Sequence, residues 1–334
     1  MKTRIQEPLR FERIFLEKVW GGRALAAAAE AGGLGLELPA DMPVGETWEL
    51  VDRQDVNSIV KDGAFAGARL EELMGDHQGD LLGQVAATPG GRFPLLVKYI
   101  DAAAHLSVQV HPDAARAANE ASWEAKTEAW VILGTTPEGL IYHGFAPGVT
   151  REAFVRAVRS GASLAPTLRA FHPVPGECYL VPGGTVHAIG AGVTLIEVQQ
   201  NSDTTFRVDD WGRLGLDGLP RAVHVEEALR CLDFESAPRP IAAPEPCLAP
   251  LELAACGAFT MGLVDVTTRL AGDTGGHAPR VLAAVRGAGR LVHGAGALEL
   301  KLGDVCLLPA ALGAYFIQSN GSAPLRLIDM QPKS

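Results

Sequence analysis

The segment GECYLVPGGTVH, at residues 176–187, has a counterpart later in the chain, GDVCLLPAALGA at residues 303–314. Each has a glycine six residues before a proline, with an acidic residue and a short apolar run between them. Glycine and proline end strands, because glycine adopts turn conformations freely and proline cannot donate to a β-ladder. The recurrence therefore predicts two copies of one β unit. The first copy ends at His187 and the second at Ala314, so only the first can bind a metal through this position.

Short runs rich in Val, Ile, Leu and Thr recur between Gly and Pro along the rest of the chain, as in FPLLVKYI (93–100), HLSVQVHP (105–112) and TLIEVQQ (194–200). This pattern is typical of an antiparallel sandwich or barrel. Helical patterns are confined to residues 70–85, 113–124, 150–161 and 225–232, with Thr150 as an N-cap. We therefore predict an all-β chain in which helical insertions between residues 70 and 161 cover the mouth of a first barrel.

The stretch at residues 237–250 is dense in proline and alanine, a composition typical of a linker. Residues 251–334 contain further strand-like runs and no long helical pattern. The sequence therefore predicts a first domain at residues 1–236, a linker at 237–250, and a smaller all-β domain at 251–334 that lacks metal ligands.

The composition excludes several classes of function. The 334 residues are 47% hydrophobic and 20% charged, and carry a formal net charge of -10. A chain this acidic lacks the basic footprint that nucleic-acid phosphates require. No apolar run is long enough to span a bilayer, so we expect a soluble, cytoplasmic protein without a membrane partner. The five cysteines form no CxxC pair, so a metal here would need His, carboxylate or amide ligands.

Candidate metal ligands lie in the predicted first domain. Gln109 and His111 are two residues apart in an alternating run, so both side chains project from the same face of one strand. Glu128 opens the next apolar run, and His187 ends a segment whose Gly, Pro, Gly and His spacing resembles the second cupin motif. Two imidazoles, one carboxylate and one amide oxygen suit Zn²⁺ in an open catalytic site. Judged by ligand type alone, the same set also suits Mn, Co or Fe. Taken singly, Gln109 is also compatible with a backbone cap and Glu128 with a solvated acid.

Several further motifs occur together with these ligands. They are FPLLVK (93–98), LSVQVHPD (106–113), KTEAW (126–130), VPGGTVH (181–187), EVQQNSDTTFR (197–207) and DWGR (210–213), with VWGG (19–22) and GETWE (45–49) near the N-terminus. In this order they resemble the type I mannose-6-phosphate isomerases, in their short bacterial form, within the cupin superfamily. The resemblance covers about Phe11 to Leu232, and the remaining tail agrees only as a second, degenerate cupin.

The resemblance implies a bicupin fold and the interconversion of mannose 6-phosphate and fructose 6-phosphate by proton transfer between C1 and C2. It implies one Zn²⁺ per chain on Gln109, His111, Glu128 and His187, a phosphosugar as the small-molecule partner, and a monomer or small homo-oligomer. The other matching positions are Lys98, Lys126, Asp203 and Arg207.

Physical reasoning gives these positions provisional roles. The fork of Arg207 suits a phosphate, with Lys98 and Lys126 as further phosphate or substrate donors. Lys126, Asp203 and Glu197 are rival proton carriers. The alternatives are structural: an ion pair between Arg207 and Asp203, solvated strand ends at Lys98 and Lys126, and a solvent-facing Glu197.

The sequence departs from the expected motifs in three places. Ala125 precedes Lys126 where some longer relatives carry a polar residue, Phe206 replaces a Tyr, and no Asn follows His187. Two other functions remain open: a different cupin enzyme, such as a dioxygenase or an isomerase of another phosphosugar, and a catalytically idle sugar-phosphate sensor.

Overall fold

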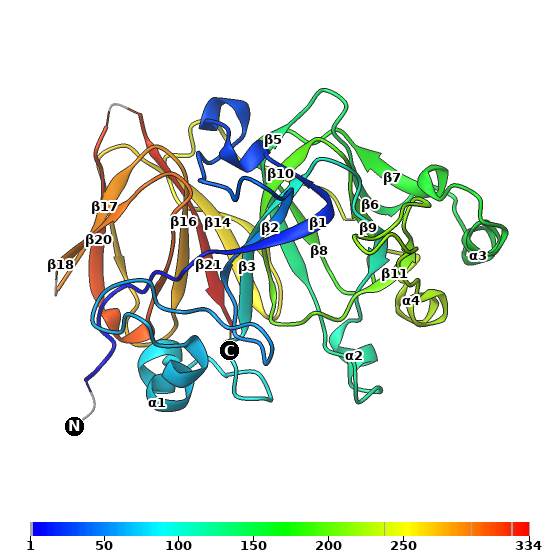
Figure 1. The fold of residues 1–334 in the computed structure, drawn as a ribbon. Helices are drawn as coiled ribbons and strands as arrows, with labels where there is room; N and C mark the ends of the chain where they lie inside the picture. Colours follow the sequence, from blue (N-terminus) through cyan, green and yellow to red (C-terminus); the bar gives the residue numbers. More distant parts are fainter. Residues whose placement is uncertain (1–2, 237, 295, 322, 334) are drawn as a thin grey trace.

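The computed structural model describes residues 3–236, 238–294, 296–321 and 323–333. Antiparallel strands dominate it and form four sheets, which Figure 1 shows as successive layers across the long dimension of the molecule. Within the described residues, no hydrogen-bonded strand pairing joins two facing sheets into a closed barrel. The predicted predominance of β-structure is thus confirmed, whereas the fold consists of open sheets in face-to-face pairs.

The N-terminal part of the chain, up to Ala242 and called the first half from here on, forms two of these sheets. Across the seven-stranded sheet the order is β1 (Ile14–Gly22), β2 (Val44–Leu50), β3 (Leu95–Ala102), β10 (Val193–Gln200), β5 (Glu128–Thr135), β8 (Glu177–Val181) and β12 (Ile241–Ala242). Across the facing five-stranded sheet the order is β11 (Phe206–Asp209), β4 (Val108–Val110), β9 (His187–Ile189), β6 (Ile141–Phe145) and β7 (Leu168–Phe171).

The second half forms the other pair. One sheet has the order β13 (Leu251–Ala255), β14 (Phe259–Val266), β21 (Leu325–Pro332), β16 (Arg280–Arg286) and β19 (Val305–Leu308). The other has the order β15 (Arg269–Asp273), β20 (Ala314–Ser319), β17 (Gly289–His293) and β18 (Gly296–Leu300).

The two pairs of sheets have the same strand order. β2-β3-β10-β5-β8 corresponds to β13-β14-β21-β16-β19, and β4-β9-β6-β7 corresponds to β15-β20-β17-β18. In this correspondence β9 begins at His187 and β20 begins at Ala314, the two residues that end the repeated segments of the sequence. The topology thus agrees with the predicted duplication.

The core is continuous across the two halves. The seven-stranded sheet and the β13-β14-β21-β16-β19 sheet pack through one apolar cluster that includes Tyr99, Val131, Met261 and Ile328. Alternate residues of β3 and β10 point the other way, toward the five-stranded sheet. That second face is apolar at one end, around Trp130 and Tyr179, and polar at the other, where the candidate site lies.

In the part of the chain that the structure describes, four α-helices lie outside the sheets: α1 (Leu70–Leu82), α2 (Ala114–Ala117), α3 (Arg151–Ser160) and α4 (Val225–Cys231). Thr150 caps α3 as predicted, because its hydroxyl accepts from the Ala153 amide at 3.2 Å. The helix predicted at residues 113–124 is limited to the single turn of α2. Beyond it the chain turns so that the ring of Trp123 packs 4.6 Å from that of Phe206.

The expectation that helices between residues 70 and 161 cover a barrel mouth is wrong for α1. This helix contacts the short 3-10 helix η4 (Ala310–Leu312) of the second half, and its apolar residues join the core shared by the two halves. α3 and α4 instead cover the outer face of the β11-β4-β9-β6-β7 sheet, through Phe154 and Leu229. The remaining 3-10 helices are η1 (Ala24–Ala26), η2 (Ala29–Ala31) and η3 (Ala165–Thr167).

The predicted linker at residues 237–250 is held against both halves. Its first residue, Ala237, lies outside the described residues. Within it β12 adds to the edge of β8, and the Cys247 amide donates to Asp265 at 2.7 Å. The segment therefore has fixed contacts, because its backbone completes a sheet edge. Among the described residues, no helix combines the length and apolar character that crossing a membrane requires.

Candidate metal centre and active site

The candidate site lies between the two sheets of the first half, because strand pairing aligns its residues on facing surfaces. On the five-stranded sheet Arg207 pairs with Gln109 across β11 and β4, and Gln109 pairs with His187 across β4 and β9. Paired residues of adjacent strands project from the same face. These three side chains therefore form a row that faces the seven-stranded sheet.

The facing sheet contributes a second row. Lys98 of β3 pairs with Glu197 of β10, and Gln199 of β10 pairs with Glu128 at the start of β5. Glu128 and Glu197 differ in register by two, so both carboxylates point to the same side of the sheet. Residues separated by almost 100 positions in the sequence thus share one cavity.

His111, Glu128 and His187 could hold a metal ion, since their ligand atoms all lie within 4.8 Å of one another. The two carboxylate oxygens of Glu128 are each 3.3 Å from one imidazole Nε2, of His111 and of His187 respectively. All three side chains are almost fully buried.

Backbone carbonyls fix the orientation of both imidazoles. His111 Nδ1 donates to Thr204 O at 2.9 Å, and His187 Nδ1 donates to Thr185 O at 2.9 Å. Burial lowers the pKa of both imidazoles, that of His187 to about 3, so the rings are neutral. Each Nε2 then presents a lone pair toward the Glu128 carboxylate, and neither Nε2 has a hydrogen-bond partner among the described residues. A cation between these acceptors satisfies all of them, so the residues present fit a metal.

Gln109, the fourth predicted ligand, lies beside His187 and lines the same cavity. Its Oε1 is 3.4 Å from the Ser107 hydroxyl. The Gln109 side chain thus lies on the face of β4 that carries the candidate site, and its role as a metal ligand stays a prediction.

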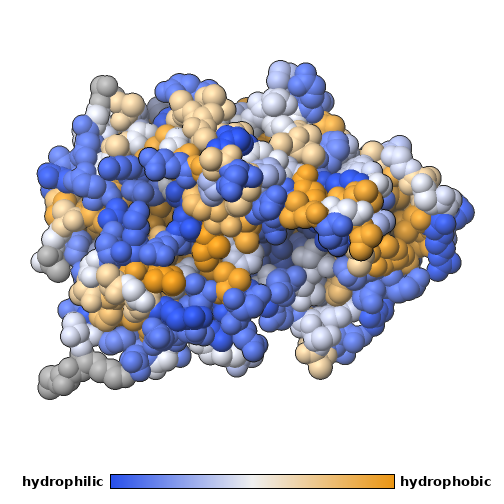
Figure 2. Space-filling model, in the orientation of Figure 1, coloured by the Kyte–Doolittle hydropathy of each residue, from blue (hydrophilic) through white to orange (hydrophobic). Residues whose placement is uncertain are grey.

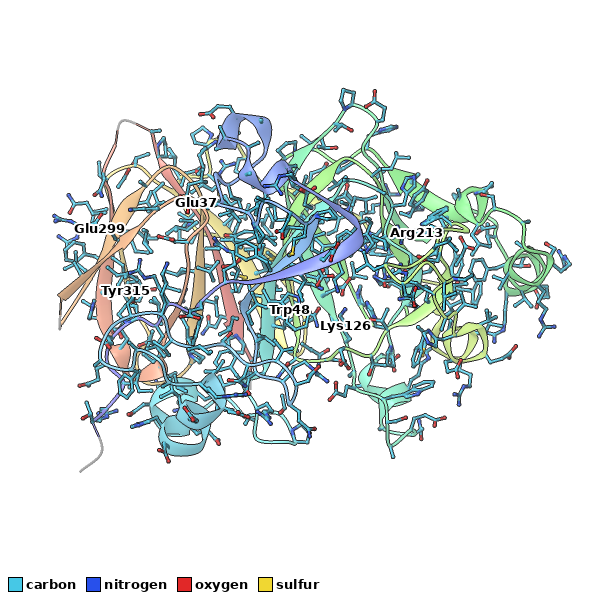
Figure 3. All side chains as sticks on the ribbon, viewed as in Figure 1. Glu37, Trp48, Lys126, Arg213, Glu299 and Tyr315 are labelled. Atoms are coloured by element: carbon cyan, nitrogen blue, oxygen red, sulfur yellow. The ribbon has the colours of Figure 1, made fainter. Side chains whose placement is uncertain are left out.

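The cavity has a volume of about 270 Å³ and is strongly charged. Its cationic lining residues are Lys18, Lys98, Lys126, Arg207 and Arg221, and its anionic ones are Glu46, Glu128, Glu197 and Asp203. Figure 2 shows the surface hollowed near the middle of the molecule, where Figure 3 labels Lys126. The charges and the opening together suit a small anionic substrate.

Glu197 is buried and only 2% exposed, so the alternative that it faces solvent is wrong. The register of β10 turns its carboxylate inward, where Oε1 lies 3.1 Å from Lys98 Nζ. Burial, together with the neighbouring Glu128 carboxylate, raises the pKa of Glu197 to about 7. Although burial alone lowers the pKa of Lys98, the carboxylates of Glu197 and Glu46 raise it above its usual value. The cavity thus contains a carboxyl group that titrates near neutrality beside a fixed ammonium.

The exposure to solvent differs among the three other predicted catalytic residues, Lys126, Arg207 and Asp203. Lys126 is buried, with Nζ 3.0 Å from Glu128 Oε2. Arg207 donates to Ala222 O at 2.6 Å, and burial and nearby Arg221 lower its pKa. The Asp203 side chain is 67% exposed and pairs with Arg53 at 3.1 Å. Among the described residues, Arg207 and Asp203 form no ion pair with each other, so that structural alternative is wrong too.

Sequence reasoning did not assign roles to three charged residues of the cavity, Lys18, Glu46 and Arg221. Glu46 of β2 lies 3.9 Å from Lys98 Nζ and accepts from Trp48 Nε1 at 2.7 Å. Arg221 binds Asp210 through two nitrogens, at 2.7 and 2.5 Å. The alternation of Glu46 and Trp48 within GETWEL indicated that both side chains project from one face of a strand, which could have identified Glu46. No such pattern surrounds Arg221, which lies in a loop.

Comparisons with known proteins identify the family of the chain. The catalytic-domain model of phosphomannose isomerase type I matches residues 9–130. The mannose-6-phosphate isomerase ManA of Bacillus subtilis is 33% identical over 319 residues, which cover 93% of this chain and 96% of the relative. The chain belongs to the type I phosphomannose isomerase family.

Other members support this assignment at lower coverage or identity. A mannose-6-phosphate isomerase of Streptococcus mutans is 34% identical over 226 residues, covering 68% of each chain. The crystal structure of a Bacillus subtilis mannose-6-phosphate isomerase has a TM-score of 0.82 at 28% identity, covering 97% of this chain and 99% of that one. A structure from Archaeoglobus fulgidus, with a TM-score of 0.74 at 22% identity, shares the fold. The phosphomannose isomerase resemblance inferred from the motifs is therefore confirmed, and the fold likeness extends over both halves.

Proposed function

We propose that this protein is a metal-dependent aldose-ketose isomerase that interconverts mannose 6-phosphate and fructose 6-phosphate. The observation that carries the proposal is that Glu128 belongs both to the candidate metal cluster with His111 and His187 and to the charged cavity that contains the buried Lys98–Glu197 pair. The names of the relatives support the choice of substrate.

One Zn²⁺ is held by His111, Glu128, His187 and Gln109. When bound, it supplies Lewis acidity for the oxygens at C1 and C2 of the sugar. The absence of thiolates among its ligands keeps that acidity high.

Glu197 is the preferred proton carrier. Starting from the aldose, its carboxylate takes the proton from C2, the C–H electron pair becomes the C1–C2 double bond, and O1 takes a proton. Return of the carbon proton to C1, with loss of the proton from O2, gives the ketose. A base with a pKa of about 7 suits both directions at neutral pH. Lys98 orients the Glu197 carboxylate, while the exposure of Asp203 disfavours that residue as the carrier.

Arg207 is the proposed phosphate ligand, because its guanidinium fork suits an anionic oxygen group. Lys126 is already beside Glu128, so it serves the sugar oxygens near the metal. Lys98, which the resemblance implies as a further substrate donor, is engaged by two carboxylates.

We also propose that residues 1–236 form the catalytic unit, 237–250 a connecting segment, and 251–334 a degenerate cupin without metal ligands. The matching strand orders and the replacement of His187 by Ala314 support this division.

A coupled assay for fructose 6-phosphate, formed from mannose 6-phosphate, tests the function. Protein stripped by a chelator should be inactive, zinc should restore turnover, and His187→Ala should remain inactive. Absence of turnover with zinc, manganese, cobalt or iron(II), despite measurable metal binding, would refute the assignment.

A further inference from the structure

The second half contains a cavity at the place that corresponds to the catalytic cavity of the first. It has a volume of about 360 Å³, within the range of roughly 300 to 1,000 Å³ for small-molecule sites. It lies between the two C-terminal sheets and is lined by residues of β14, β16, β20 and β21. Figure 3 places Tyr315, one of its lining residues, among these strands.

Strand register gives the correspondence residue by residue. β10 and β21 each have eight residues, and each pairs along its whole length with β3 or β14. Glu197 is the fifth residue of β10, and Asp329 is the fifth of β21. Glu128 pairs with Val181, which precedes Pro182 of the first repeated segment. Arg280 pairs with Leu308, which precedes Pro309 of the second, so Arg280 corresponds to Glu128.

The metal ligands are therefore replaced by groups of different chemistry. Arg280 occupies the position of Glu128, and Ala314 that of His187. The guanidinium of Arg280 forms an ion pair with Asp329. The second cavity thus has the Arg280 guanidinium at the position where the first has the candidate metal ligand Glu128.

The polar groups of this cavity have few partners among the described residues. Asp329 Oδ1 is buried without a hydrogen-bond partner, and among the described residues Arg280 donates only to Asp329. The Tyr315 hydroxyl has no hydrogen bond to any described residue, and its ring lies over Gly272, where a Cβ would come within 2.3 Å. Buried polar atoms ordinarily have partners, so Asp329 Oδ1 calls for a hydrogen-bonding ligand, which the Arg280 guanidinium and the Tyr315 hydroxyl can also reach from the cavity lining.

The charges define the class of ligand. Arg280 is one cation against two anions, Asp329 and Glu252, whereas the catalytic cavity has more cationic than anionic side chains. Excess negative charge disfavours a phosphate or carboxylate. Thr260 and Gln331 add neutral polar groups, and Leu270 and Ile317 supply an apolar wall.

We propose that this second cavity binds an uncharged sugar or sugar alcohol, whose adjacent hydroxyl groups accept from Arg280 and donate to Asp329. Tyr315 completes the site with its free hydroxyl. The proposal is independent of the isomerase activity, because none of these residues lies in the catalytic cavity.

Calorimetric titration of the zinc-loaded full-length protein with mannitol tests it. We expect saturable binding that weakens about tenfold in Tyr315→Phe and in Asp329→Asn, the loss of about one hydrogen bond. Arg207→Ala, in the catalytic cavity, should leave mannitol binding unchanged, and inorganic phosphate should not displace mannitol.

Tyr315→Phe removes one unpartnered hydroxyl and should keep parental thermal stability and turnover of mannose 6-phosphate, so the test holds even if Asp329→Asn folds poorly. The proposal is overturned by absence of saturable binding, by binding that Tyr315→Phe leaves unchanged, or by binding that is lost in Arg207→Ala or competed by phosphate.

Discussion

Lys98 and Glu197 face each other across the β3–β10 pairing, with Nζ and Oε1 3.1 Å apart inside the charged cavity. The Lys98 ammonium holds the Glu197 carboxylate in place. It does not cancel the rise in the pKa of Glu197 that burial causes, because Lys98 is shared with Glu46. A carboxyl group that titrates near pH 7 results, and this relationship leads to the first two predictions.

Glu197→Gln should lower kcat by about 10²- to 10⁴-fold, the range typical of a lost general base. The amide keeps the size of the side chain, so the fold and zinc binding should persist. Steady-state kinetics, with circular dichroism and zinc titration as controls, checks this. A variant that retains more than a tenth of the parental kcat would exclude Glu197 as the proton carrier.

The stability of the metal-free protein should depend on pH through Glu197. The folded-state pKa is about 7, above the ordinary 4.5, so between these values the folded state holds a proton that the unfolded state releases. The stability contributed by this proton is complete below about pH 4.5 and is lost as pH rises through 7. The melting temperature of the parent, relative to that of Glu197→Gln, should therefore fall between pH 5 and pH 8. An unchanged difference across this range would contradict the raised pKa.

Asp203→Ala should reduce kcat by less than about tenfold, because an exposed ion pair at the rim contributes little. Kinetics under the conditions used for Glu197→Gln allow a direct comparison of the two carboxylates. A loss as large as that of Glu197→Gln would move the proton-transfer role to Asp203.

Removal of metal should destabilise the fold. A ligand present at a thousandfold excess over its Kd stabilises the native state by about 4 kcal/mol, so zinc should raise the denaturation midpoint of chelator-treated protein. His187→Ala should abolish most of this shift, whereas His172→Ala, a change of an exposed histidine, should preserve it. Equal shifts in the two variants would place the zinc elsewhere.

Thr150→Ala should cost about 1 kcal/mol in unfolding free energy, through loss of the α3 N-cap. Thr150→Ser keeps the hydroxyl and should be nearly neutral. Urea denaturation of both variants measures the difference, and isomerase activity should be unaffected. Equal stability of the two variants would argue against the cap.

The sequence was most informative where the determining pattern is local. Period-two spacing put Gln109 and His111 on one face, and the repeated segment singled out His187 over Ala314. It could not align Glu197 with Lys98, because that pairing depends on the register of strands nearly 100 residues apart. The sequence likewise predicted a helix at residues 70–85, but the contact of α1 with η4 depends on how the two halves pack.

The apolar cluster between the two halves has a consequence for engineering and for inherited variation. Tyr99 and Val131 form the back of the sheet whose front holds Lys98 and Glu128, and their packing partners include Met261 and Ile328. A protein truncated after residue 250 would expose to water the apolar back face of the sheet that carries the active-site residues. Substitutions deep in the C-terminal portion should therefore silence the enzyme without touching any group that meets the substrate, and such alleles would be misread as catalytic if judged by activity alone.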